Sequence, residues 1–260
     1  MIMDELQSAI NKTKEYAHRY GQRLNDNQLF LRLISPDIYP FSIFKNKGIN
    51  NFVDSEWQKK YILAKRLITQ HLSKMRGIEM VGITGSVAAE AVDKNEDIDL
   101  LIITKENELW WWRLYLRFYI WWHDIPHRRF GEKERKDEFC FNLWLDRANL
   151  KIPKQKRSLK NATDLVIMKV IFDKNGCYQN FLRENGWVKK YLASGYGERI
   201  KNKTPLIPLD KGGQKKILVN FIKKDINRIL FWGQYWYMQM KSKSKLKYIE
   251  IGQAFFHKDA

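Results

Sequence analysis

The chain has 260 residues, enough for two domains or for one domain with additions. Its 47 lysines and arginines exceed its 29 aspartates and glutamates, and the formal net charge of +18 favours a polyanionic partner, most simply RNA or DNA and otherwise a membrane surface. Two cysteines, Cys140 and Cys177, exclude a disulfide framework and fit a reducing cytoplasm. The polar N-terminus is unlike a signal peptide, and no stretch is long and apolar enough to span a bilayer. We therefore expect a cytoplasmic protein with no membrane partner.

The first 55 residues predict a small N-terminal module. Residues 4–34 repeat apolar side chains at helical spacing. Residues 39–53 place apolar side chains on both sides of the turn residues 46–48, which is typical of a hairpin. Helices followed by a hairpin indicate a winged-helix-like module over residues 1–55. Such a module would either contact nucleic acid or pack on the rest of the chain.

Turn residues and paired acids follow an amphipathic helix predicted over residues 57–75. A short apolar run ends at Gly85-Ser86, and Asp97 and Asp99 lie two apart at the start of the next apolar run. The free backbone N–H groups and the hydroxyl of the Gly-Ser turn predict a phosphate-binding turn.

Alternation along the second strand brings the two acids together. Side chains two apart in a strand project to the same face, so Asp97 and Asp99 would share one face while Ile98 and Leu100 point to the core. Two like charges this close need a cation between them, and carboxylate ligands suit Mg²⁺ or Mn²⁺.

The next predicted helix, residues 109–122, is apolar on all sides and carries five tryptophans. Tryptophan suggests base stacking, but a helix that is apolar all round is more typical of the core, and we favour that interpretation. Arg113 and Arg117, one turn apart, would reach a phosphate or pair with acids. A strand over residues 139–145 then alternates, with Cys140 and Asn142 on one face.

Beyond residue 151 the pattern is helical. Helices are predicted over 161–172 and 178–192, a loop over 193–213, and a long amphipathic helix over 215–240. Residues 211–247 contain ten basic residues and one acid beside an aromatic cluster, which indicates either a solvated face or a nucleic-acid groove. The candidate phosphate contacts in this groove are Lys215, Lys216, Lys223, Lys224 and Arg228.

Gly85-Ser86, followed after ten residues by Asp97-Ile98-Asp99-Leu100, resembles the signature of the DNA polymerase beta-type nucleotidyltransferase superfamily. Three further stretches resemble a subgroup of prokaryotic nucleotidyltransferase-domain proteins: KDEFCFNLWLD at 136–146, NGWVKKYL at 185–192 and QAFFHKD at 253–259. The likeness runs from about residue 50 to the end of the chain. It implies an α+β fold with a nucleotidyltransferase palm, a mixed sheet with helices, over 56–150 and a helical C-terminal domain over 151–260.

The resemblance also implies an activity. Asp97 and Asp99 would hold Mg²⁺ or Mn²⁺, Gly85 and Ser86 would bind the phosphates of an NTP, and the acceptor would be RNA, tRNA-like in kind. A basic residue of the first helix after the catalytic domain would reach the triphosphate, a role that falls to Lys169. Apart from the resemblance, the position of Arg113 in its apolar helix makes it a further candidate for nucleotide binding.

Members of the superfamily usually carry a third metal-binding carboxylate on the later strand. This chain has Asn142 there, and an amide cannot act as a base. Asp146 or Glu138, at the ends of that strand, would have to replace it as a metal ligand. Otherwise the protein is a weak or inactive enzyme that binds nucleotide or RNA. Transfer to a protein or to a small molecule is a further alternative.

Overall fold

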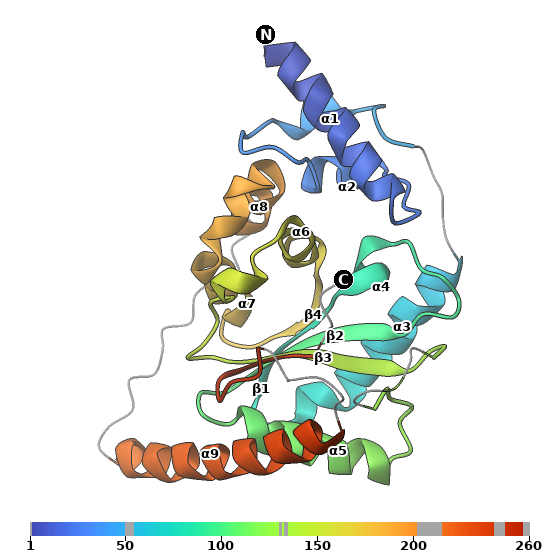
Figure 1. Cartoon of the computed structure of the whole chain (residues 1–260). Helices are drawn as coiled ribbons and strands as arrows, with labels where there is room; N and C mark the ends of the chain where they lie inside the picture. The colour runs from blue at the N-terminus through green and yellow to red at the C-terminus, as the bar shows by residue number, and fades with distance from the viewer. Residues whose placement is uncertain are drawn as a thin grey trace.

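A computed structural model describes residues 2–49, 55–129, 132, 135–201, 215–241 and 248–256, without the side chains of Ile2, Ser55, Asn142 and residues 215–222. The fold is α+β, with a mixed five-stranded sheet between two layers of helices (Figure 1). The strand order is β4-β1-β2-β3-β5, and of the adjacent pairs β2 and β3 run parallel while the others are antiparallel. The strands are β1 (Ile78–Ile83), β2 (Ile98–Thr104), β3 (Phe139–Asp146), β4 (Lys169–Asp173) and β5 (Gln253–Phe255).

The helices divide between the two faces of the sheet. One layer contains α3 (Ser55–Gln70), α5 (Leu109–Trp122) and α9 (Lys215–Lys241). The other contains α1 (Ile2–His18), α2 (Asp26–Leu31), α6 (Leu159–Ile167), α7 (Cys177–Glu184) and α8 (Ala193–Lys201). A short helix, α4 (Gly85–Ala89), joins β1 to the loop before β2, and 3-10 turns cover Phe41–Phe44, Leu72–Lys74, Lys154–Lys156 and Gly186–Lys190.

Strand β2 is apolar on both faces because helices cover both sides of the sheet. Leu100 and Ile102 pack on the α3/α5/α9 side, whereas Leu101 and Ile103 pack on the α1/α2 side. Ile98 is buried with the first group, so the predicted orientation of Ile98 and Leu100 toward the core is confirmed.

The described N-terminal residues contain the predicted helices, but the first arm of the predicted hairpin is not a strand. Asn25 caps α2 through a capping box with Gln28, which is why the helical run breaks there. The first arm of the expected hairpin is the 3-10 turn Phe41–Phe44, because Phe44 turns inward onto Phe30 in the core. The second arm falls largely on residues 50–54, outside the described residues.

The C-terminal part is not purely helical, and three expectations for it were wrong. The helix predicted to run to residue 172 ends at Ile167, and Lys169–Asp173 pairs with β1 as β4. This segment, KVIFD, is rich in β-branched and aromatic residues, which favour a strand. The tail adds β5 beside β3, and part of the expected loop over 193–213 is the helix α8. Two of the five strands therefore come from beyond residue 151.

Helices 57–75, 109–122 and 215–240 were predicted close to the bounds of α3, α5 and α9. None of the helices in the described part of the chain is long and apolar enough to cross a membrane.

Candidate metal and nucleotide site

The Gly-Ser turn and the acids of β2 meet at one edge of the sheet. β1 pairs antiparallel with β2, so Thr84, directly after β1, donates its backbone N–H to the Asp99 carbonyl at 3.0 Å. Gly85 has φ +64°, and a Cβ on it would lie 2.5 Å from Asp99 Oδ2. The absence of a side chain at Gly85 therefore allows the Asp99 carboxylate to lie directly against the turn.

Among the described residues, a thiol joins the two carboxylates in a group that could hold a metal ion. Oxygen atoms of Asp97 and Asp99 and the sulfur of Cys140 all lie within 4.8 Å of one another. Asp97 and Cys140 are buried, and Asp99 is half-buried. Cys140 comes to this position because it pairs with Asp99 across the parallel β2–β3 ladder.

A bulge in β3 directly follows the residue that pairs with Asp99. Between the pairs Asp99–Cys140 and Leu101–Leu143, two residues of β2 span three of β3. The extra residue breaks the simple alternation that the sequence predicted for Cys140 and Asn142. Bulges depend on the partner strand, so the sequence of β3 alone carries no signal for it.

An arginine that no sequence pattern singles out neutralises Asp97. Arg128 Nη1 donates to Asp97 Oδ2 at 2.6 Å, and the two side chains are only 16% and 5% exposed. The backbone N–H of Arg128 also donates to the Phe139 carbonyl at 3.0 Å, which places the arginine beside β3. It lies in a charged connection, and nothing in that stretch distinguishes it from the neighbouring Arg129.

A buried lysine supports the loop in front of Asp97. Lys60 of α3 is almost fully buried, and its ammonium donates to the carbonyls of Lys94 and Glu96. The backbone N–H of Ile98 donates to the Glu138 carbonyl at 2.9 Å. These contacts fix the loop that carries Asp97 from two sides.

The donor set fits a hard divalent cation through its two carboxylates. Mg²⁺ and Mn²⁺ prefer oxygen ligands, and Mg²⁺ commonly takes one or two carboxylates and completes its shell with water and substrate phosphates. Burial, together with the charges of Asp99 and Asp97, raises the pKa of the Cys140 thiol. A thiol is also a soft ligand, which suits Mg²⁺ poorly. Arg128 holds the place of a cation beside Asp97.

Of the two acids considered as third ligands, Glu138 lies at the metal end of β3 and Asp146 lies at the other end. Glu138 precedes Phe139, the partner of Ile98, and its Oε2 is buried without a hydrogen-bond partner among the described residues. Asp146 pairs with Thr104, about 20 Å along β2 from its start. The buried carboxylate of Asp146 accepts hydrogen bonds from Ala148 and Asn149, so it holds a turn and does not join the metal group.

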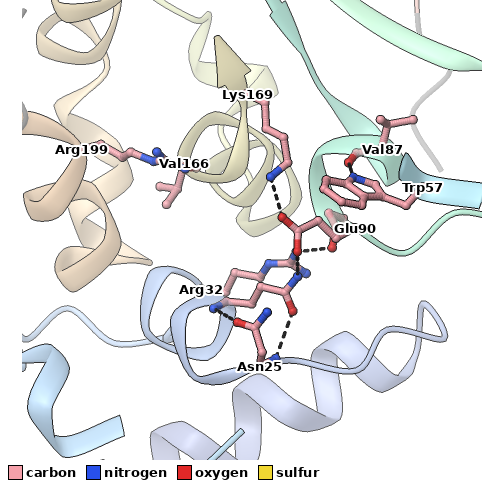
Figure 2. Close-up of polar contacts among 10 residues, drawn as sticks. Asn25, Arg32, Trp57, Val87, Glu90, Val166, Lys169 and Arg199 are labelled. Atoms are coloured by element: carbon pink, nitrogen blue, oxygen red, sulfur yellow. Dashed lines mark hydrogen bonds and ion pairs between the residues drawn. The ribbon is translucent and has the colours of Figure 1, made fainter. Parts of the chain in front are cut away.

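Lys169 lies near the Gly-Ser turn. It was predicted to lie in a helix, but it is the first residue of strand β4. It pairs with Ile83, the last residue of β1. Its ammonium donates to Glu90 Oε1 at 2.6 Å and lies 5.3 Å from the Trp57 ring, and the Trp57 indole N–H donates to the Val87 carbonyl (Figure 2). Glu90 is the C-cap residue of α4. It therefore holds Lys169 at the opposite end of this short helix from Gly85.

The N-terminal helix α2 and its C-cap residue Arg32 contact the C-terminal end of α4. Arg32 is buried, and its guanidinium donates to the Ala89 carbonyl at 2.7 Å and to Gln22 Oε1 at 2.6 Å. Gln28 donates to Glu90 Oε2 at 2.6 Å. Burial lowers the pKa of Arg32 to about 10, which leaves it charged at neutral pH. The turn that would bind phosphate is thus supported by the N-terminal helices.

Arg113 is not brought to this site. It is buried between α5 and α9, where it donates to Gln234 Oε1 at 2.6 Å and lies 4.6 Å from the Phe256 ring. Burial lowers its pKa to about 9. This placement gives its guanidinium a role in joining the two helices.

The basic residues of α9 have different surroundings. Lys223 donates to Glu108 Oε1 at 2.5 Å, so it ties α9 to the start of α5. Lys224 and Arg228 are exposed. The side chains of Lys215 and Lys216 lie outside the described part of the chain.

We compared the sequence with protein-family models and with curated proteins. No family model matches the chain. No curated protein matches it either.

Proposed function

We propose that this chain is a metal-dependent nucleotidyltransferase that moves an NMP from an NTP to an acceptor hydroxyl. The observation that carries the proposal is the contact between Gly85 and Asp99. The Gly-Ser turn and the paired acids, twelve or more residues apart in the sequence, meet at one end of β1 and β2, and the close approach of Asp99 requires the glycine. A phosphate-binding turn beside a metal-binding carboxylate pair is the arrangement that triphosphate chemistry needs.

In this proposal the protein positions the reactants and neutralises charge. Bound at Asp97 and Asp99, a Mg²⁺ or Mn²⁺ ion would supply charge neutralisation for the triphosphate. The backbone N–H groups and the hydroxyl of Gly85-Ser86 bind the β- and γ-phosphates. The acceptor oxygen forms a bond to the α-phosphorus, the bond to the bridging oxygen breaks, and pyrophosphate leaves with that electron pair. The acceptor proton passes to solvent, because the buried Cys140 thiol is no base.

We propose RNA as the acceptor. The net charge of +18 and the exposed Lys224 and Arg228 support a polyanionic partner. The same charge disfavours a small cationic acceptor, which prefers an acidic site.

A second candidate function is a nucleotide- or RNA-binding module with little or no catalysis. Two observations favour it. Arg128 already neutralises Asp97, and the acids gathered in the metal group of the described residues are two, not three. A site of this composition can hold a nucleotide without the ligand set for rapid transfer.

One experiment separates these functions. The protein is incubated with each labelled NTP, total cellular RNA and Mg²⁺ or Mn²⁺, and the products are resolved on a gel. We expect a labelled RNA band that is lost in Asp97→Asn and Asp99→Asn and kept in Asp93→Asn, an exposed acid of the same loop. Nucleotide binding with no labelled product would favour the binding module, and a labelled protein band would move the acceptor to a protein.

A further inference from the structure

Helix α5 presents a ridge of aromatic side chains to solvent. Trp111, Tyr115, Phe118 and Trp122 recur at steps of four, three and four residues, so they form one stripe along the helix, and all four are exposed. The expectation that α5 is buried all round was therefore wrong for this face. Its other face, with Trp110, Leu116 and Ile120, does pack on the sheet.

The ridge ends in two highly exposed tryptophans. Trp121 is 72% exposed and Trp122 is 77% exposed. An aromatic groove of about 370 Å³ opens beside them, lined by Tyr115, Phe118, Tyr119, Trp121, Trp122 and His123. Contiguous exposed apolar side chains on a soluble protein often mark an interaction surface.

The second half of α9, a helix of the same layer (Figure 1), also exposes apolar side chains. Trp232, Trp236 and Met240 are exposed there, with Met240 at 79%. We call the exposed side chains of α5 and of residues 229–240 the aromatic face.

Cations gather at the C-terminal ends of both helices. Arg117 Cζ lies 6.0 Å and Lys241 Nζ 5.1 Å from the centre of the Tyr237 ring. A hydrogen bond from Lys241, with the charges of Lys241, Arg117 and Arg129, lowers the pKa of Tyr237, so Arg129 belongs to the same cluster. Apolar rings are thus flanked by positive charge.

We propose that the aromatic face docks this protein on the surface of an anionic lipid bilayer. Exposed tryptophan and tyrosine rings suit the boundary between headgroups and acyl chains, and flanking lysines and arginines pair with anionic headgroups. Such a helix lies in the plane of the interface and does not span the membrane. The proposal therefore departs from the expectation of no membrane partner drawn from the sequence. The inference does not depend on the proposed nucleotidyltransferase activity.

The charge distribution favours lipid over single-stranded RNA on this face. Stacked bases need cations along the strand to contact their phosphates. The two arginines of α5 are both directed to α9: Arg113 is buried there and Arg117 lies over Tyr237. The ridge itself is therefore apolar along its length. A second copy of the chain is also disfavoured, because two bodies of charge +18 repel each other.

Vesicle binding tests the proposal. The full chain is sedimented with vesicles of phosphatidylcholine mixed with phosphatidylglycerol, and with vesicles of phosphatidylcholine alone. We expect binding to the anionic vesicles, with a blue shift of the tryptophan emission, and much weaker binding to the neutral ones. Trp121→Ala/Trp122→Ala should weaken binding by roughly tenfold or more, because each indole is a large apolar side chain withdrawn from water.

A matched control uses exposed apolar residues outside the aromatic face. Tyr20→Ala/Ile38→Ala removes two such side chains from the N-terminal part and should bind vesicles like wild type. Both double variants alter exposed side chains, so thermal melting should show that both are folded. If Trp121→Ala/Trp122→Ala melts early, Phe118→Ser is tested for vesicle binding in its place.

Three results would overturn the proposal. One is the absence of binding to anionic vesicles. Another is a wild-type protein that binds RNA but not vesicles, together with loss of the RNA binding in Trp121→Ala/Trp122→Ala. The aromatic face would then be a base-stacking surface. The third is a wild-type dimer that this variant converts to a monomer, since the face would then be covered by a second copy.

Discussion

A substitution of Gly85 tests the contact on which the candidate site depends. Gly85→Ala adds a Cβ at φ +64°, a conformation that costs an L-residue about 1–2 kcal/mol. The same Cβ would lie 2.5 Å from Asp99 Oδ2, closer than side chains pack, so the Asp99 carboxylate must move. We expect a modest loss of stability and a large loss of metal affinity.

Gly21 provides a matched control for the conformational cost of an alanine at positive φ. It has φ +67°, and a Cβ there would meet no atom within 4 Å. Gly21→Ala therefore carries the same conformational cost of about 1–2 kcal/mol without touching the site. The difference between the two variants isolates the displacement of Asp99.

The assay combines denaturant unfolding with a Mn²⁺ titration of each variant. Both variants should lose about 1–2 kcal/mol of unfolding free energy, and Gly85→Ala should also bind Mn²⁺ at least about tenfold more weakly, which corresponds to about 1.4 kcal/mol. Mn²⁺ binding by Gly85→Ala equal to wild type would refute the argument that Asp99 is a ligand held against the turn. An equal loss of Mn²⁺ affinity in Gly21→Ala would show that the effect of Gly85→Ala does not come from the displacement of Asp99.

Three further predictions concern charge. Arg128→Met removes the cation that pairs with the buried Asp97, so the metal-free protein should lose about 3 kcal/mol of unfolding free energy. Mn²⁺ should restore much of this stability. A loss of stability that Mn²⁺ leaves unchanged would argue against a shared position for the arginine and the metal. Burial raises the pKa of Asp164 to about 6, so its contribution to stability is full below pH 3.8 and is lost as pH rises through about 6. Asp164→Asn should flatten this dependence in pH-dependent melting and stabilise the protein at pH 7, whereas an unchanged pH profile would contradict it. Lys224→Glu/Arg228→Glu should reduce the slope of log K against log salt for single-stranded RNA by about 1.4, and an unchanged slope in a filter-binding series would show that this end of α9 is merely solvated.

The sequence was sufficient to predict the strand, turn and strand around the acids. That prediction depended on local pattern alone: an apolar run, a Gly-Ser break and two acids with strand spacing. Since β1 and β2 are adjacent and antiparallel, the turn and Asp99 had to meet. The helices α5 and α9 were likewise predicted from periodicity within one segment.

The neighbours of the acids could not be predicted in the same way. Cys140 reaches Asp99 through a parallel pairing with a bulge, and Arg128 reaches Asp97 through a connection with several similar arginines. Both depend on register between segments about 30 to 40 residues apart, which the pattern of one segment does not contain. Lys169 was assigned to a helix because of the apolar residues Leu165, Met168 and Val170 around it, and pairing with β1 decided in favour of the strand.

The two proposed surfaces lie on different sides of the sheet. The contacts of Arg32 and Gln28 join the end of α4 to α2, which packs on the opposite face of the sheet from α5 and α9 (Figure 1). A chain docked on lipid through its aromatic face would therefore keep the N-terminal helices and the α4 end of the Gly-Ser turn toward solvent. Because neither surface uses the side chains of the other, Trp121→Ala/Trp122→Ala should leave Mn²⁺ affinity unchanged, and Gly85→Ala should leave vesicle binding unchanged. A loss of both properties in either variant would mean that the two surfaces are coupled through the sheet, and that the separation argued from packing is wrong.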